Sequence, residues 1–162
     1  MDRRRVAASA IAAAGLVLAA WLLWPKKPAD DEALIRQAIT RMAQEAAERD
    51  VNGILAHVSE RYAGEGGDKR ELKRYLLGYL LRSEVVTALT ANVQLAEPVA
   101  GGKAKVSFVV LLARKPAQKV EDLRTEELIG SHHIEAQMEK EDGVWRAVDA
   151  TRRDASPQDW LR

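Results

Sequence analysis

Histidines are the clearest candidates for metal or proton chemistry in this 162-residue chain. His132 and His133 are adjacent in a segment that alternates apolar and polar residues, and His57 stands alone. Neighbouring residues on a strand point to opposite faces, so the pair cannot readily hold one metal ion. The chain also has no cysteine and no HExxH pattern. We therefore expect no metal and no cofactor, and we interpret the pair as partly solvated strand histidines that could titrate near neutral pH.

The histidine pair belongs to a stretch, Val86 to Arg153, whose alternating pattern predicts four antiparallel strands in a meander. The predicted strands are residues 89–95, 104–112, 132–140 and 144–153. In the first strand, the apolar residues that share one face are Leu89, Ala91, Val93 and Leu95. Glycines, which tolerate positive φ, mark tight turns at Gly101-Gly102 and at Gly143. Because the apolar face of such a sheet must be buried, we expect helices against it.

The second predicted strand is apolar on both faces, since Val109 and Leu111 lie opposite its main apolar side. It should therefore be central in the sheet. The polar residues beside this apolar pair are His133 and Glu135. A small apolar centre with a polar rim is typical of protein interfaces, which favours a homodimer or a protein partner. Alternatively, the long segment Arg114 to Ser131 covers the pair within one chain, or extends the flanking strands into a hairpin arm.

Three amphipathic segments precede the strands, and each begins at a capping residue. Asp30 or Asp31 starts the first, Asp50 starts a shorter second, and Asp68 with Glu71 resembles a capping box before the third. The predicted buried stripe of the third helix is Leu72, Tyr75, Leu76, Tyr79 and Leu80. Its other side carries a basic row of Lys69, Arg70, Lys73, Arg74 and Arg82. This row could touch anionic lipid headgroups, but we prefer the simpler interpretation of a solvated helix face.

The chain opens with Arg3-Arg4-Arg5, and residues from Val6 to Trp24 carry no charge. A spanning helix needs roughly 20 apolar residues, and flanking arginines mark its cytoplasmic side. We therefore expect a single-pass membrane anchor with a cytoplasmic N-terminus. The alternative is a signal peptide cleaved after Val17-Leu18-Ala19, although the apolar run continues beyond that site.

The expected organisation is an anchor at 1–24, a linker at 25–30, one α+β domain at 31–154 and a tail at 155–162. The domain would lie outside the cytoplasm in the cell envelope.

Without residues 1–24 the chain has 22 basic and 23 acidic residues. Phosphate binding needs a basic surplus on one face, so we expect no nucleic-acid partner.

The order of three helices and four strands, with two short phrases, resembles the nuclear-transport-factor-2-like superfamily. These phrases are Asp50-Val51-Asn52-Gly53-Ile54-Leu55 and Asp142-Gly143-Val144-Trp145-Arg146. The resemblance covers residues 31–153. It implies an α+β cone, in which three helices pack on a curved four-stranded antiparallel sheet around a pocket. The superfamily includes ketosteroid isomerases, polyketide cyclases and dehydratases, and also non-catalytic binding domains, many of which pair through the exposed sheet face.

Catalytic members of the superfamily place an acidic base and a hydrogen-bond donor inside the pocket. The segment where isomerase-like members keep an aspartate reads Arg61-Tyr62-Ala63-Gly64 here, without a carboxylate. Asp149 could face a pocket, and the possible donors are Tyr62, Tyr75 and Tyr79. We prefer the interpretation that Asp149 is a strand aspartate paired with Arg146, Arg152 or another surface charge, so we assign no catalytic residue.

Two classes of function stay open. The first is a non-catalytic, membrane-tethered domain that binds a protein partner or a small apolar ligand, and the anchor favours it. The second is a pocket enzyme of the isomerase, cyclase or dehydratase type, which only the family resemblance favours.

Overall fold

The computed structural model describes residues 30–160, and its helices begin at the aspartates predicted to cap them. Asp30 caps α2 (Asp31–Ala47) and Asp50 caps α3 (Val51–Ala56), each by accepting a backbone N–H. Asp68 and Glu71 form the predicted capping box of α4 (Lys69–Arg82). The expected membrane anchor, residues 1–24, lies outside the described residues. No helix within residues 30–160 is long and apolar enough to cross a membrane.

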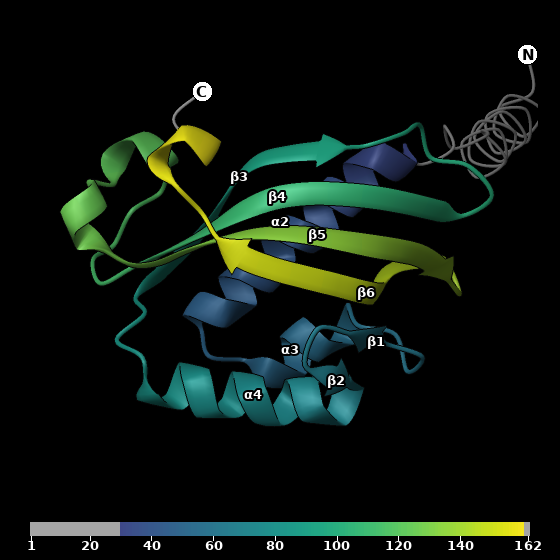
Figure 1. Ribbon diagram of the computed structural model, residues 1–162, viewed down its shortest axis with the longest axis horizontal. Helices are drawn as coiled ribbons and strands as arrows, with labels where there is room; N and C mark the ends of the chain where they lie inside the picture. Colours follow the sequence, from purple (N-terminus) through teal and green to yellow (C-terminus); the bar gives the residue numbers. More distant parts are fainter. Residues whose placement is uncertain (1–29, 161–162) are drawn as a thin grey trace, which may run out of the picture.

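Four antiparallel strands follow the helices in the order β3-β4-β5-β6, which confirms the predicted meander (Figure 1). They are β3 (Thr87–Leu95), β4 (Lys103–Ala113), β5 (Leu128–Glu141) and β6 (Val144–Asp154). Gly101 and Gly102 adopt φ angles of 57° and 69° in the β3–β4 turn, as a tight hairpin requires. A small hairpin of β1 (Ala63–Gly64) and β2 (Gly67–Asp68), which the sequence pattern did not predict, joins α3 to α4.

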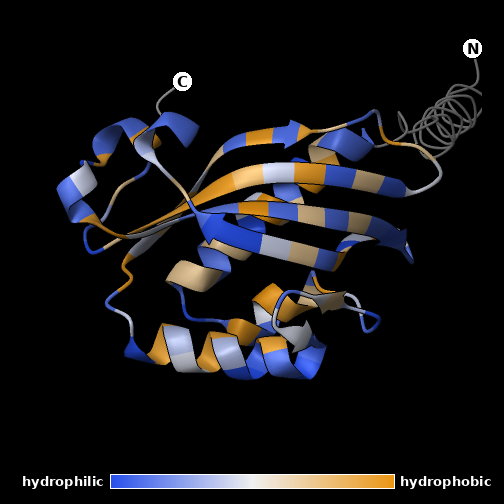
Figure 2. Cartoon of the chain, in the orientation of Figure 1, coloured by the Kyte–Doolittle hydropathy of each residue, from blue (hydrophilic) through white to orange (hydrophobic). Residues whose placement is uncertain are grey.

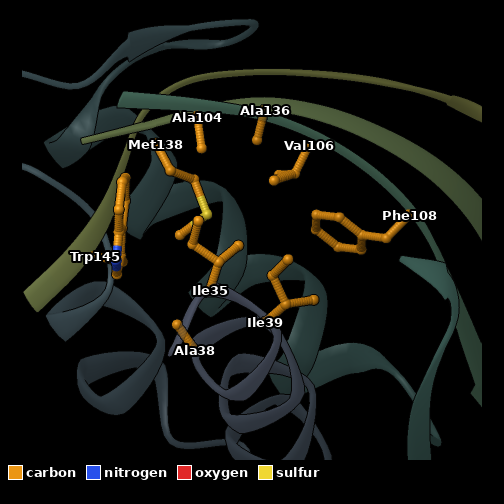
Figure 3. Close-up of a cluster of buried hydrophobic side chains, with 9 residues drawn as sticks. All are labelled: Ile35, Ala38, Ile39, Ala104, Val106, Phe108, Ala136, Met138 and Trp145. Atoms are coloured by element: carbon orange, nitrogen blue, oxygen red, sulfur yellow. The ribbon is translucent and has the colours of Figure 1, made fainter. Parts of the chain in front are cut away.

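The inner face of the sheet packs on α2 (Figure 3). The buried residues of this core are Ile35, Ala38, Ile39, Ala104, Val106, Phe108, Ala136, Met138 and Trp145. Trp145 donates its indole N–H to Asp31 at 3.2 Å, and Lys140 reaches the same carboxylate oxygen at 2.6 Å. The start of α2 is thereby joined to the β5–β6 turn, and the core holds the helix across the sheet.

A β-bulge overturns the prediction that one face of β3 is uniformly apolar. The pairing of β3 with β4 shifts register between Ala91 and Gln94, where Asn92 has a φ of 50°. A one-residue insertion reverses the face of every following side chain. Leu89 and Ala91 therefore pack on the outer face, whereas Val93 packs on the inner core.

The outer face of β4 is covered within the chain. Val109 and Leu111 are 1% and 0% exposed, under Leu123 of the long connection and Trp160 near the C-terminus. The short helices here are η1 (Val120–Asp122), η2 (Thr125–Glu127) and η3 (Pro157–Asp159). Residues 155–160, expected to form a tail outside the domain, fold back onto the sheet. Val109 and Leu111 therefore do not form the exposed interface centre that we expected, and the intrachain alternative is the one observed.

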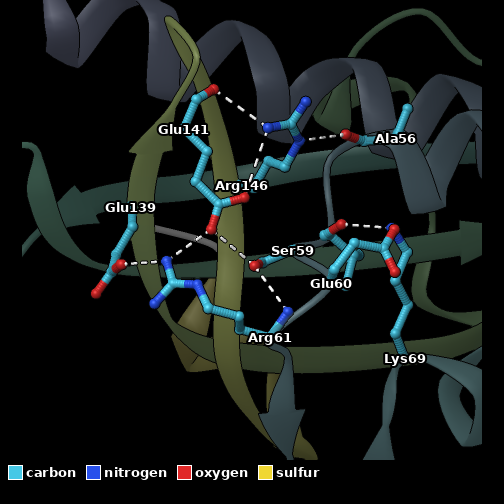
Figure 4. Close-up of polar contacts among 9 residues, drawn as sticks. Ala56, Ser59, Glu60, Arg61, Lys69, Glu139, Glu141 and Arg146 are labelled. Carbon is cyan, nitrogen blue, oxygen red and sulfur yellow. Dashed lines mark hydrogen bonds and ion pairs between the residues drawn. The ribbon is translucent and has the colours of Figure 1, made fainter.

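Residues 57–65 run along the edge of β6 that is not paired with β5. Their hydrogen bonds hold this segment beside the inner face of the sheet. Ser59 donates its backbone N–H to Ala147 at 2.9 Å, and Glu65 donates to Ala150 at 2.9 Å. The Arg61 guanidinium bridges Glu139 and Glu141 at 2.7 Å each (Figure 4). The backbone hydrogen bonds from Ser59 and Glu65 pair groups of the β6 edge that would otherwise lack a partner in the protein.

Candidate functional site

A cavity of about 400 Å³ lies between α4 and the inner face of the sheet. The segment from Tyr62 to Gly66 forms part of its wall, and β4, β5 and β6 supply the side opposite α4. Apolar side chains dominate the lining: Ala46, Leu72, Leu76, Leu80, Val110, Leu112, Ile134 and Ala150. A concave, mostly apolar space with a few polar groups is the usual form of a small-molecule site.

The cavity exists because α4 packs on α3 and β2 rather than closely on the sheet (Figure 1). Along α4, apolar and polar residues alternate at helical spacing (Figure 2). Of the stripe predicted to be buried, Leu80 is buried, but Tyr75 is 46% exposed. The stripe thus borders an open space, and the expectation of a solidly packed face was wrong.

Three of the four predicted pocket residues line this cavity. Tyr62 comes from the segment beside β6, and Tyr75 and Tyr79 come from α4, where their rings stack with centroids 6.0 Å apart. Burial raises the pKa of Tyr62 and of Tyr79. Both hydroxyls therefore keep their protons at neutral pH and can donate hydrogen bonds.

Asp149 does not line the cavity, because a second bulge turns it to the outer face. Gln137 pairs with Asp149 and Met138 with Ala147, which leaves Val148 as an extra residue in β6. Trp145 and Ala147 are buried, on the inner side. The outer-facing Gln137 amide lies 3.4 Å from the Asp149 carboxylate. The bulge thus keeps Asp149 out of the cavity that the tyrosines line, although the Asp149 charge still contributes to the raised pKa of Tyr62.

His132 is a cavity residue that the sequence interpretation missed. Burial lowers its pKa, and the nearby charge of Arg152 lowers it further, so the imidazole is neutral at pH 7. A Cβ placed on Gly130 would lie 3.2 Å from His132 Nε2 and 3.4 Å from the Tyr79 hydroxyl. Both polar atoms therefore lie near Gly130, a residue without a side chain. His132 alternates with Ile134 and Ala136, and this pattern could have placed it on the inner face.

Arg152 and Glu65 also line the cavity without having been predicted to. The Arg152 guanidinium donates to the Tyr75 hydroxyl, and its central carbon lies 5.3 Å from the ring centroid. The backbone N–H of Arg152 donates to the Glu65 carboxylate at 2.6 Å. The Val148 bulge, which brings Arg152 to the inner face, cannot be read from alternation.

The remaining predicted interface residues occupy a polar outer surface. Glu135 lines a pocket of about 470 Å³ with Gln137 and Asp149, and the nearest oxygen of Glu135 lies 4.0 Å from His133 Nδ1. His132 and His133 face opposite sides of β5, as expected. Among residues 30–160 no group of three or more histidines and carboxylates could hold a metal ion.

Neither a family model nor a curated protein matches the sequence. Solved structures do match the fold. A cystatin-like protein of unknown function from Nostoc punctiforme aligns with a TM-score of 0.60 and 19% identity, over 80% of this chain and 95% of that one. A provisionally assigned scytalone dehydratase from Novosphingobium aromaticivorans gives 0.61 and 15%, over 78% and 85%.

An NTF2-like protein of unknown function from Pseudomonas putida gives a TM-score of 0.52 and 16% identity, over 76% of this chain and 87% of that one. At these identities the likeness concerns the fold. The chain therefore has the cystatin-like α+β fold of NTF2-like proteins, with a curved antiparallel sheet, as the resemblance implied. The expectation that three helices pack on this sheet is met only in part, because α4 packs mainly on α3 and β2.

Proposed function

We propose that this protein is a non-catalytic binding protein whose cavity holds a small, mostly apolar ligand. The observation that carries the proposal is the 400 Å³ space lined by leucine, valine and tyrosine side chains. Burying apolar ligand surface there would contribute about 25 cal/mol for each Å² removed from water. Burial of Val109 and Leu111 removes the main reason to prefer a protein partner on the outer face.

We also propose that the N-terminal segment tethers this domain to a membrane, with the domain in the cell envelope. The uncharged run from Val6 to Trp24 and the arginines before it support this part. A tethered carrier would hold an apolar compound close to the bilayer from which such compounds partition.

Two neighbouring leucines of α4 allow a matched test of ligand binding. Leu76 lines the cavity, whereas Leu77 is 37% exposed. The full chain, held in lipid nanodiscs, would be titrated with fluorescent naphthamide, and empty nanodiscs would give the lipid background. We expect saturable binding by the wild type and Leu77→Trp, and loss of binding by Leu76→Trp, whose indole fills the space. Equal binding by both variants would contradict the proposal.

A pocket enzyme of the isomerase, cyclase or dehydratase type is a second candidate, which the positions of His132 Nε2 and the Tyr79 hydroxyl near Gly130 favour. A neutral imidazole beside a phenol can act as a base and a hydrogen-bond donor for proton abstraction next to a carbonyl. Proton exchange into a bound naphthyl ketone in heavy water would test this. Exchange that His132→Gln abolishes supports an enzyme, and exchange at the same rate in both proteins argues for binding alone.

A further inference from the structure

We propose that the natural ligand is an acid whose apolar body lies among the leucines of the cavity and whose carboxylate, or a similar oxyanion, binds Arg152 beside Tyr75. This inference rests on the proposed binding function, because it names the chemical class that the same cavity accepts.

The first observation concerns the ion pairing of Arg152, an exposed residue at the wall of the cavity. No ion pair between residues 30 and 160 includes its guanidinium. By contrast, two other arginines of β6 are paired: Arg153 with Asp159 at 2.9 Å, and Arg146 with Glu141 at 3.5 Å. A guanidinium has five N–H donors, and the Tyr75 hydroxyl takes one of those on Arg152. The others can bind both oxygens of a carboxylate.

The second observation is that Arg152 is already oriented. Its guanidinium lies over the Tyr75 ring, and the backbone N–H beside it is held by Glu65 at 2.6 Å. An arginine positioned in this way loses less side-chain entropy when it binds an anion. Tyr75 itself lines the cavity, so an anion on Arg152 would lie beside the apolar wall.

The charges of the other lining residues are compatible with a single negative group. Tyr62 and Tyr79 are neutral at pH 7 as tyrosines ordinarily are, and burial lowers the pKa of His132, which favours its neutral form. Glu65 is the carboxylate of the lining, and it accepts the Arg152 backbone N–H without an ion pair to the guanidinium. An apolar acid would contact both the leucine wall and the charged donors of Arg152, whereas a neutral apolar compound would contact the leucine wall without a charged hydrogen bond to Arg152.

Naphthoate and naphthamide form a suitable pair of probes, because they have nearly the same shape and differ in charge. The full chain in nanodiscs would be titrated with each at neutral pH. We expect the wild type to bind naphthoate about tenfold or more tightly than naphthamide, as a charge-assisted contact predicts. Added salt should weaken the binding of naphthoate and leave that of naphthamide unchanged.

Three variants test whether the preference for naphthoate over naphthamide depends on Arg152. Arg152→Gln should remove the preference, so that naphthoate and naphthamide bind with similar affinity, and Arg152→Lys should keep part of the preference because the charge remains. Arg153→Gln removes the next charge along β6 and should keep the full preference. Circular dichroism would confirm that each variant is folded, and if Arg152→Gln is not, the lysine variant and the salt dependence decide.

Equal affinity of the wild type for the two probes, or a preference that survives in Arg152→Gln, would overturn the acid proposal and leave the binding function intact. A wild type that binds neither probe would overturn the binding function as well. These results are distinguishable because naphthamide reports on the apolar wall alone.

Discussion

We expect His132 to couple the stability of the domain to pH through its burial. Its pKa is lowered from the ordinary value of 6.5, first by burial and then by the Arg152 charge. Between the lowered pKa and 6.5 the unfolded chain binds more protons than the folded chain. Stability therefore falls as the pH drops through this window, and this contribution levels off below it.

His132→Gln should remove this part of the pH dependence. Urea unfolding at several values between roughly pH 8 and pH 5 would measure it. We expect the wild type to lose stability below pH 6.5 and the variant to follow a flatter curve in that range. Carboxylates with lowered pKa values, such as Glu139, lose their contribution at lower pH and do not interfere. Identical curves for the two proteins would show that His132 is not buried in solution.

Among the elements, the C-terminal segment and the connection between β4 and β5 turn an ordinary outer sheet face into a second core. Trp160 and Leu123 cover Val109 and Leu111 there. Because the outer face is covered in this way, the cavity under α4 is the candidate apolar surface for binding a ligand.

Trp160→Ala should therefore destabilise the domain by about 3–5 kcal/mol, as expected for removal of a buried aromatic ring. Gln158→Ala, an exposed change in the same segment, should cost less than about 0.5 kcal/mol. Chemical unfolding of both variants gives the comparison. A loss below about 1 kcal/mol for Trp160→Ala would mean that the segment does not pack on the sheet.

For the whole molecule, the decisive prediction concerns its orientation in a membrane. A reporter that works only outside the cytoplasm, fused after Arg162, should be active because the arginines at residues 3–5 stay inside. A reporter that works only inside the cytoplasm should be silent at the same position. The opposite pair of results would reverse the orientation, and a mature N-terminus near Ala20 would show that the segment is cleaved.

The sequence by itself determined the features that depend on neighbouring residues. Asp30, Asp50 and Asp68 each cap a helix through atoms within three residues, so the helix starts could be predicted. The turn at Gly101 and Gly102 and the inward face of Phe108 likewise follow from local conformation and from a period of two.

The tertiary structure decided which residues meet. The bulges at Asn92 and Val148 each reverse the face of the residues that follow, and the Val148 bulge brings Arg152 into the cavity and moves Asp149 out of it. The alternation of apolar and polar residues cannot reveal a bulge, because the extra residue arises from the way one strand pairs with another. The cavity likewise depends on tertiary packing. The apolar stripe of α4 has the pattern of a packed helix face, but α4 packs on α3 and β2, which leaves a space between this stripe and the sheet.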